Sequence, residues 1–227
     1  MKTIAATVIN LFPSLQTILL KLSVYPRFLI WRKRYAVTPL IEAAPREKRQ
    51  QLYRRVIDVY KLEGEAILYV EFGVHEGASI FWWANNNTNP ASNFVGFDSF
   101  EGLPEEWISN RPKSFFSTDG ATPQTDDIRV RFIAGWFHET LHRSLEIFQT
   151  NARKIIHLDA DLYRSTIYPL LLLGPYLRSG DILMFDEFLD SINEYRAFEE
   201  FIGIFGFEYD VVAATKNYAQ IAIHLRS

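Results

Sequence analysis

The chain has 227 residues, of which 48% are hydrophobic and 15% aromatic, and its formal net charge is −3. These values describe a globular protein large enough for one α/β domain with an extension. The slightly acidic balance gives no basis for nucleic-acid binding. Because the sequence has no cysteine, disulfides, thiolate metal sites and a cysteine nucleophile are excluded.

The first sixty residues predict a helical extension. Residues 3–20 are uncharged and largely apolar, and a basic group follows them: Arg27, Arg32, Lys33 and Arg34. We expect residues 1–62 to pack on the domain or on a second subunit, which would make a homo-oligomer. Contact with a membrane surface is the alternative. Within this region, apolar residues at helical spacing over 46–62 predict an amphipathic helix, with a lid as its candidate role.

A glycine turn follows the first predicted strand, 66–72. Gly73 and Gly77 permit a tight turn and close approach of the backbone to a ligand, and the helix that begins near Ile80 offers free N–H groups. This turn departs from the dinucleotide pattern, because His75 stands where the second glycine would be. On its own, the turn therefore does not identify a ligand.

The next two strands add features of an adenosine site. The strand over 94–97 ends at Asp98, and a carboxylate there is placed to bind ribose hydroxyls. A connection of about thirty residues follows, and connections of that length usually line a binding site. After the third strand, 129–133, Gly135 and Trp136 could flank a purine at the start of a helix, although Trp136 suits the core equally well. Together these residues favour an adenosine-type ligand.

Carboxylates follow two further strands. The apolar runs 155–158 and 182–185 are typical of buried parallel strands, and a helical stretch over 162–177 joins them. Parallel strands joined in this way end at the same edge of the sheet, so the acids after them should lie close together. These acids are Asp159, Asp161, Asp186 and Glu187. Their crowding calls for a cation or a shared proton, and oxygen ligands favour magnesium. Two unrelated, solvated strand ends are the alternative.

The last third completes the predicted sheet. An amphipathic helix over 191–205 precedes two strands, 209–213 and 221–225, joined as a hairpin. Five parallel strands and this hairpin predict a seven-stranded, mostly parallel α/β sheet with one antiparallel member. That is the Rossmann-like plan of the class I methyltransferases, with the helical extension added.

In several of these segments the chain resembles the S-adenosylmethionine-dependent O-methyltransferases of the macrocin O-methyltransferase type. The matching segments run from about residue 71 to 188 and are EFGVHEGAS, VGFDSFEGLPE, the FFSTDG loop, VRFIAGWFHETL, LDADLYRST and GDILMFDEF. They occur in the order and spacing of the family. The resemblance implies a methyltransferase domain over residues 63–227.

The resemblance also implies which residues bind the cofactor S-adenosylmethionine. They are Glu71, Gly73, Glu76, Ser79, Asp98, Ser99, Gly135 and Trp136. In this scheme Asp98 binds the ribose, Ser99 lies nearby, and Gly135 and Trp136 flank the adenine.

For the acids, the resemblance implies that Asp159, Asp186 and Glu187 bind magnesium and that Asp161 is the general base. The family usually has two aspartates where this chain has Asp186-Glu187, which puts the geometry and identity of the metal in question. Three histidines are alternative bases: His75, His138 and His157.

The expected activity is methylation of a hydroxyl on a sugar, a glycosylated small molecule or a glycan, in secondary metabolite or glycan biosynthesis. We expect the protein to be cytoplasmic. Two alternatives remain: a metal-independent methyltransferase, and a non-catalytic cofactor-binding or membrane-surface protein. A dehydrogenase is disfavoured because the dinucleotide glycine pattern is absent.

Overall fold

The central strands are apolar on both sides because helices cover both faces of the sheet. The computed structural model describes residues 13–35, 45–106 and 112–226. In β1 (Ile67–Phe72), Ile67 and Tyr69 join one core cluster, whereas Leu68 and Val70 join the other. This alternation follows from the two-residue period of a strand. The continuous apolar runs in the sequence therefore reflect a sheet that is buried on both faces.

The sheet has seven strands in the order β3-β2-β1-β4-β5-β7-β6. The other strands are β2 (Asn93–Asp98), β3 (Val130–Ala134), β4 (Arg153–Leu158), β5 (Ile182–Phe185), β6 (Glu208–Ala214) and β7 (Ile221–Arg226). Strand β7 is antiparallel to both of its neighbours, and the pairs on the β3 side of it are parallel. The predicted seven-stranded sheet with an antiparallel member is confirmed.

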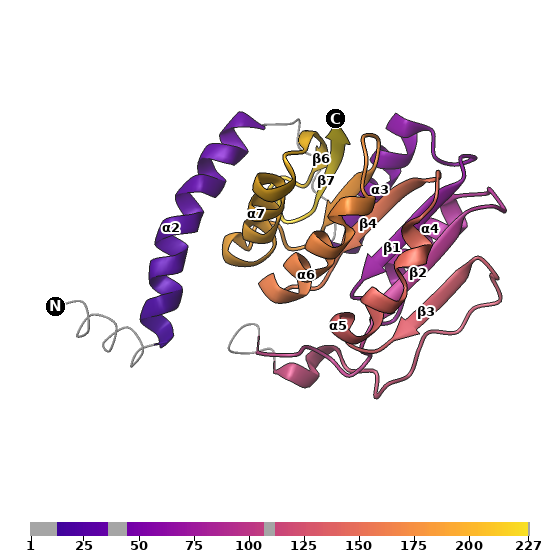
Figure 1. Cartoon of the computed structure of the whole chain (residues 1–227), viewed down its shortest axis with the longest axis horizontal. Coiled ribbons are helices and arrows are strands. Elements are labelled where there is room, and N and C mark those ends of the chain that lie inside the picture. Colours follow the sequence, from indigo (N-terminus) through magenta and orange to yellow (C-terminus); the bar gives the residue numbers. More distant parts are fainter. Residues whose placement is uncertain (1–12, 36–44, 107–111, 227) are drawn as a thin grey trace.

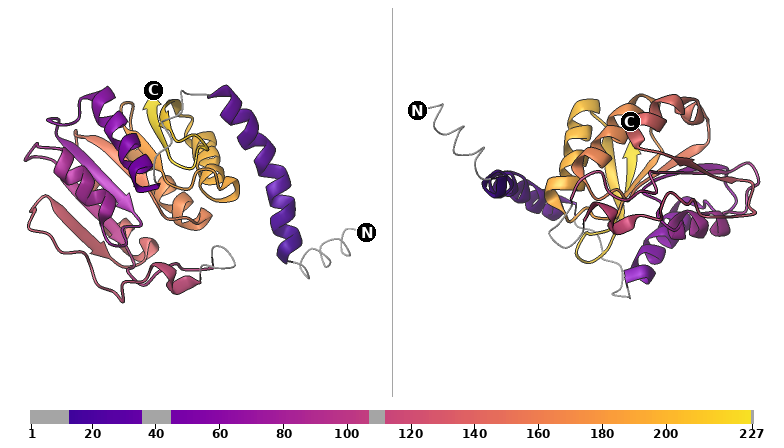
Figure 2. Two further views of the ribbon diagram at one scale, coloured as in Figure 1. Left: turned by 180° about the vertical axis from the view of Figure 1, so that it is seen from behind. Right: turned by 90° about the horizontal axis from the view of Figure 1, so that it is seen from below.

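Helices lie on both sides of this sheet (Figures 1 and 2). The helices are α2 (Pro13–Arg34), α3 (Pro45–Tyr60), α4 (Ala78–Asn86), α5 (Phe137–Thr140), α6 (Tyr163–Leu173) and α7 (Arg196–Phe205). Helices α3 and α4 contribute to one core cluster, whereas α2, α6 and α7 contribute to the other. Short 3-10 turns cover Lys113–Phe116, Leu141–Arg143, Leu145–Phe148 and Gly174–Tyr176.

Two helices differ from the sequence prediction. The helix after β3 is a single turn, α5, followed by two 3-10 turns, and Ser144 separates those turns with φ −118° and ψ 14°. The helix predicted over 191–205 begins as a π-helical turn, η5 (Ser191–Tyr195), before α7. Such turns are rare and occur often at functional sites.

The N-terminal extension is partly visible as α2, which packs beside α7 and η5. Its buried residues Val24, Phe28 and Trp31 contact an aromatic group on the domain, and the Trp31 indole N–H donates to the Tyr209 hydroxyl at 2.9 Å. Toward its N-terminus the helix extends past the domain (Figure 1). Residues 1–12 and 36–44 lie outside the described residues, so the predicted apolar stretch 3–20 is covered only in part. Within the described ranges, none of the helices combines the length and the hydropathy that a membrane crossing requires.

Candidate active site

A cavity of about 590 Å³ opens where β1, β2 and β4 end. The turn after β1, the loop after β2, the start of α5, the turn after β4 and one side of α6 form its walls. Most residues predicted for the site line it: Glu71, Gly73, Glu76, Ser79, Asp98, Ser99, Trp136, Asp159, Asp161 and Glu187. Gly135 and Asp186 are not among the lining residues, and Asp186 is fully buried behind them. The cavity thus brings together most of the residues predicted to bind the cofactor and three of the four predicted acids, Asp159, Asp161 and Glu187.

The first turn places its backbone against the acid loop. Gly73 has φ +93°, and a Cβ at this position would lie 1.9 Å from the carbonyl oxygen of Asp159. Any side chain larger than hydrogen would therefore displace the backbone after β4. Gly77 has φ +81° and precedes α4, whose first turn faces the cavity through Ala78 and Ser79. The cavity consequently includes the start of a helix, where backbone N–H groups are free to meet a polar ligand.

Asp98 is held rigidly at the end of β2. Its Oδ2 accepts the backbone N–H groups of Val74 and His75 at 2.7 and 2.8 Å, and its Oδ1 accepts that of Phe100 at 2.8 Å. These bonds tie the turn after β1 to the loop after β2. Oδ2 has both of its lone pairs engaged, whereas Oδ1 can still accept one hydrogen bond, so a ribose hydroxyl could bind a preoriented group. The Ser99 hydroxyl beside it donates to the Gly102 carbonyl at 3.1 Å.

A buried row of polar groups lies beneath the cavity. The Tyr69 hydroxyl donates to Oε2 of Glu71 at 3.0 Å and lies 2.8 Å from Nδ1 of His157. Burial raises the pKa of Glu71 well above its ordinary value, and the nearby Asp159 adds to the increase. Burial also lowers the pKa of His157 to about 4, so the imidazole is neutral at pH 7. His157 is not among the residues that line the cavity, whereas the other two histidines considered as bases, His75 and His138, line it.

Helix α3 reaches into the site from outside the sheet. The Tyr53 hydroxyl lies 3.1 Å from Oγ of Ser79, one of the predicted cofactor contacts. One turn earlier, Arg49 donates from Nη1 to Oδ2 of Asp159 at 3.1 Å, and its Nη2 forms an ion pair with Asp186. Burial alone would lower the pKa of Arg49, but Asp159 and Asp186 raise it above its ordinary value. The guanidinium therefore stays charged and bridges two of the predicted metal ligands.

Asp186 is the most deeply buried of the four acids. It is 0% exposed, and among the described residues neither carboxylate oxygen has a hydrogen-bond donor besides its ion pair with Arg49. Burial raises its pKa well above the ordinary value, and repulsion from Asp159 acts in the same direction. A second buried acid, Glu194 of η5, accepts the backbone N–H of Glu187 at 2.9 Å. Burial raises the pKa of Glu194 as well, with Asp186 adding to the effect.

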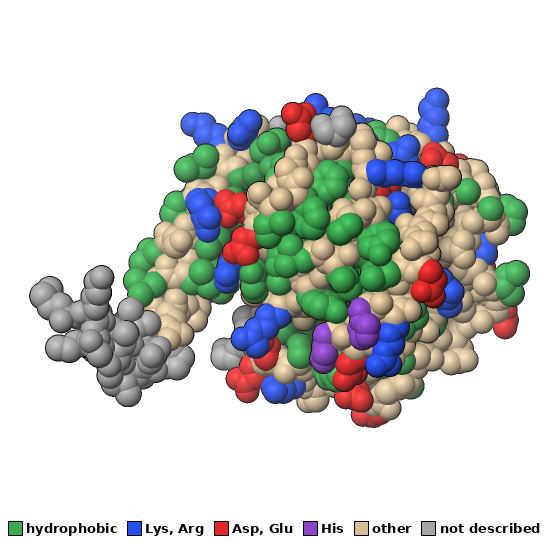
Figure 3. All heavy atoms as spheres, in the orientation of Figure 1, with side chains coloured by type: hydrophobic (Ala, Val, Ile, Leu, Met, Phe, Trp, Pro, Cys, Tyr) green, Lys and Arg blue, Asp and Glu red, His purple; other side chains and the backbone are tan. Residues whose placement is uncertain are grey.

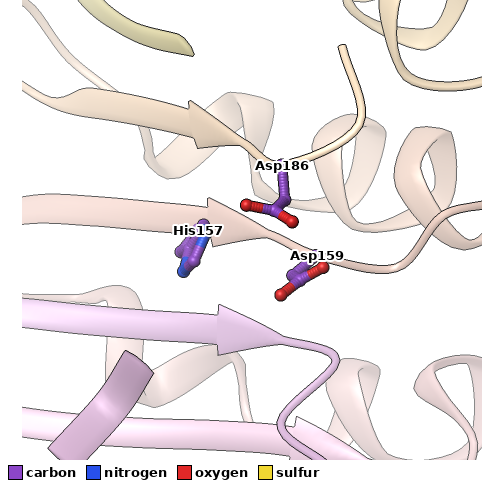
Figure 4. A group of neighbouring side chains, drawn as sticks. All are labelled: His157, Asp159 and Asp186. Atoms are coloured by element: carbon purple, nitrogen blue, oxygen red, sulfur yellow. The ribbon is translucent and has the colours of Figure 1, made fainter. Parts of the chain in front are cut away.

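The donor set at the end of β4 and β5 suits a divalent cation. His157, Asp159 and Asp186 each offer a ligand atom, and these atoms lie within 4.8 Å of one another (Figure 4). Two carboxylate oxygens are hard ligands of the kind magnesium prefers. On the histidine, Nε2 would be the available nitrogen, because Nδ1 contacts Tyr69. The structure thus groups Asp159 and Asp186 as predicted, with His157 as the third neighbour, while Glu187 faces the cavity from the next position.

Asp161 stands apart from this group. It lies two residues beyond Asp159, at the cavity wall, and has φ +59°. A positive φ is uncommon for aspartate and costs conformational energy, and such residues concentrate at functional sites. Arg164 and Tyr168 of α6, the helix that follows Asp161, also line the cavity.

Three residues of this site were not predicted from the sequence: Arg49, Tyr53 and Glu194. Arg49 and Tyr53 are four residues apart and therefore lie on the same face of α3. This spacing is the one sequence feature that links them, and the same helix carries several other basic residues. Nothing in the order of residues indicates which of them faces the acids. Glu194 resembles any other acid of an amphipathic helix, and only its π-helical turn places it behind Asp186.

Comparison with known proteins identifies the family to which the chain belongs. Residues 70–188, which are more than half of the chain, match the family described as a methyltransferase domain. The chain therefore belongs to this family, and the resemblance to O-methyltransferases of the macrocin type is confirmed. The matched segment includes most of the residues that line the cavity described above.

Two curated relatives are O-methyltransferases, one of them named for a rhamnosyl compound. One is 8-demethyl-8-(2,3-dimethoxy-alpha-L-rhamnosyl)-tetracenomycin-C 4'-O-methyltransferase of Streptomyces olivaceus, 32% identical over 56% of this chain and 57% of that protein. The other is demethyldecarbamoylnovobiocin O-methyltransferase of Streptomyces niveus, 34% identical over 31% of this chain and 28% of that protein. The matches thus span about half or less of these relatives.

Solved structures agree on the fold. A calicheamicin methyltransferase superposes with a TM-score of 0.58 at 22% identity, covering 79% of this chain and 77% of that one. The O-methyltransferase NovP superposes with a TM-score of 0.53 at 20% identity, covering 80% and 79%. These likenesses show that the sheet and its helices have the class I methyltransferase arrangement.

Proposed function

We propose that this protein transfers a methyl group from S-adenosylmethionine to a hydroxyl of a sugar, on a glycosylated small molecule or a glycan, with the help of magnesium. The observation that carries this proposal is the cavity that Asp98 and Trp136 share with Asp159 and Asp161. One cavity therefore holds residues that could bind the methyl donor and residues that could act on the acceptor hydroxyl. The named relatives act on rhamnosyl and novobiocin compounds, which supports a sugar-linked acceptor.

The donor half of the cavity is formed by three features of the chain. Asp98, oriented by three backbone N–H groups, would accept a ribose hydroxyl at Oδ1. The backbone at Gly73 would allow close approach, and Trp136 would cover one side of the adenine. When bound, S-adenosylmethionine supplies a methyl group on a positively charged sulfur, which is a strong electrophile. The protein needs to align it with the acceptor and to exclude water.

The acid half would handle the proton of the acceptor. We assign Asp161 as the base: its carboxylate takes the hydroxyl proton while the oxygen forms a bond to the methyl carbon and the carbon–sulfur bond breaks. Asp159, Asp186 and Glu187 would hold magnesium, which lowers the pKa of a hydroxyl that binds it. Arg49 occupies the position between Asp159 and Asp186, so it would have to yield to the ion.

The decisive test is a methyl-transfer assay with labelled S-adenosylmethionine and a panel of rhamnosylated and other glycosylated acceptors. Transfer to a sugar hydroxyl supports the proposal, whereas cofactor binding without transfer to any glycoside would favour a non-catalytic protein. Mapping the product by NMR would identify the hydroxyl.

Magnesium is tested in the same assay with EDTA. Loss of activity that added Mg²⁺ restores supports the metal-dependent form of the proposal. Full activity in EDTA would instead assign the charge-balancing role to Arg49 and leave a metal-independent methyltransferase.

A further inference from the structure

The inner face of α2 packs on the domain, but its outer face is apolar as well. Among the described side chains of this helix, six large apolar ones are exposed: Ile18, Leu19, Leu22, Tyr25, Leu29 and Ile30. Leu22 is 67% exposed and Ile30 is 70% exposed. Four of the six recur at intervals of four, three and four residues and so form one stripe along the helix. We call these six residues the outer stripe; in Figure 3, hydrophobic side chains appear on the outer side of α2.

Basic residues border the outer stripe. The helix carries Lys21, Arg27, Arg32, Lys33 and Arg34 and no acidic residue. At 100° per residue, Lys21 and Arg32 fall on one edge of the stripe and Arg27 and Arg34 on the other. Arg27 pairs with Glu199 at 3.1 Å, and the Arg32 guanidinium lies 5.0 Å from the centre of the Tyr218 ring. Lys21, Lys33 and Arg34 are exposed.

An apolar stripe of this size on a surface helix marks an interaction surface. We propose that the outer stripe of α2 docks on an anionic lipid surface. The stripe runs along the helix, so the helix would lie parallel to the bilayer, with its apolar side chains among the acyl chains and its lysines and arginines at the lipid phosphates. This proposal rests on α2 alone and does not depend on the proposed methyltransferase activity.

Charge favours lipid over a second copy of the chain as the occupant. Two α2 helices packed through their outer stripes would place basic edges beside each other. Helix pairs of this kind are stabilised by opposite charges at their edges, and α2 has no carboxylate to supply them. Phosphate headgroups supply the missing negative charge along the part of the helix from Lys21 to Arg34.

The test is flotation of the full-length protein with vesicles of phosphatidylcholine, and with vesicles of phosphatidylcholine and phosphatidylglycerol in equal parts. We expect binding to the anionic vesicles, weakened by salt, and little binding to the neutral ones. Leu22→Glu with Leu29→Glu should weaken binding by at least about tenfold, and Lys21→Gln with Lys33→Gln by about tenfold. The matched control is Ile128→Glu, since Ile128 is 99% exposed but lies outside α2; it should bind like the unchanged protein.

Circular dichroism and thermal melting would verify that each variant folds, and the Lys→Gln pair keeps the test informative if the Leu→Glu pair does not fold. Equal binding to both vesicle types, or binding to neither, would overturn the proposal. A dimer would also overturn it. In that case the unchanged protein would be dimeric by light scattering and would not float with vesicles, and Leu22→Glu would make it monomeric.

Discussion

Strands β4 and β5 carry buried charge at both ends, and the two ends differ in how that charge is compensated. At the amino end, Lys154 and Asp181 are each 1% exposed, and Nζ of Lys154 lies 3.5 Å from Oδ2 of Asp181. Both carboxylate oxygens also accept backbone N–H groups, from Lys154 at 2.8 Å and Arg178 at 3.0 Å. One positive and one negative charge meet here, and both oxygens of the carboxylate are hydrogen-bonded.

The carboxyl end has a surplus of acid. Asp159, Asp161, Asp186 and Glu187 follow the two strands, and Arg49 bridges the first and third of them. Asp186 is completely buried, and the described part of the chain offers it no hydrogen-bond donor other than this ion pair. Burying charge that is not fully paired is costly. The same two strands therefore have paired, hydrogen-bonded charges at one end and more acidic than basic groups at the other.

The largest expected effect is on the rate, at the acid end. Asp161→Asn should lower kcat about a thousandfold, because the amide cannot accept the proton of the acceptor hydroxyl. Single-turnover kinetics would measure this, with binding of S-adenosylhomocysteine by calorimetry as the control that the cavity is intact. Turnover at the normal rate with normal cofactor binding would remove Asp161 as the base.

The next effect is on stability, at the balanced end. Asp181→Ala should lower the free energy of unfolding by about 3 kcal/mol, since Lys154 is left buried without its partner. Urea unfolding followed by circular dichroism measures it. Asp210→Ala is the matched control: its carboxylate pairs with Arg226 at 3.2 Å on the surface, and its loss should cost about 0.5 kcal/mol or less. Equal losses in the two variants would contradict the distinction between the ends.

Arg49→Gln probes the counter-ion at the acid end. Removing the guanidinium frees Asp159 and Asp186, so Mn²⁺ or Mg²⁺ should bind about tenfold more tightly to the protein without cofactor. Calorimetry or Mn²⁺ electron paramagnetic resonance would measure the affinity. Arg54→Gln serves as the control, because Arg54 lies on the same helix but bonds to Asn86 instead of the acids. Weaker metal binding in Arg49→Gln would show that the arginine assists the ion.

The smallest effect sharpens the contrast between the two ends. In EDTA, Asp186→Asn should leave the free energy of unfolding unchanged or raise it by about 1 kcal/mol, because it removes a buried carboxylate that repels Asp159. The sign is the opposite of that expected for Asp181→Ala. Urea unfolding of the two variants side by side tests it, and a loss of stability as large as that of Asp181→Ala would show that the acid end is also a structural ion pair.

The fold could be predicted from the sequence because its signals are local. Continuous apolar runs such as 155–158 identify buried strands, and glycines and acids mark where they end. Parallel pairing then places those ends together, which is why the sequence predicts that Asp159 and Asp186 lie near each other. The irregular helices could not be predicted from local signals, because the break at Ser144 and the π-helical turn before α7 depend on tertiary packing.

The charge balance of the site could not be predicted in the same way. Arg49 donates to Asp159 although the two residues are 110 positions apart in the sequence. Helix α3 carries several basic side chains, and the sequence does not distinguish Arg49 from the others. Burial likewise has no local signature for Glu194, whose neighbours in the sequence resemble those of any surface helix. The apolar stretch predicted over 3–20 includes only Ile18 and Leu19 of the outer stripe, and the orientation of the stripe away from the domain depends on the packing of Phe28 and Trp31.

The missing side chain at Gly73 has a thermodynamic consequence. With only a hydrogen atom there, the turn that would hold the methyl donor rests directly against the carbonyl of Asp159, so backbone displacement at one is transmitted to the other. Any coupling free energy between two binding sites that meet in this way is reciprocal. Whatever factor the donor contributes to the affinity for acceptor or cation, the acceptor or cation must contribute to the affinity for donor. Measuring either one determines both.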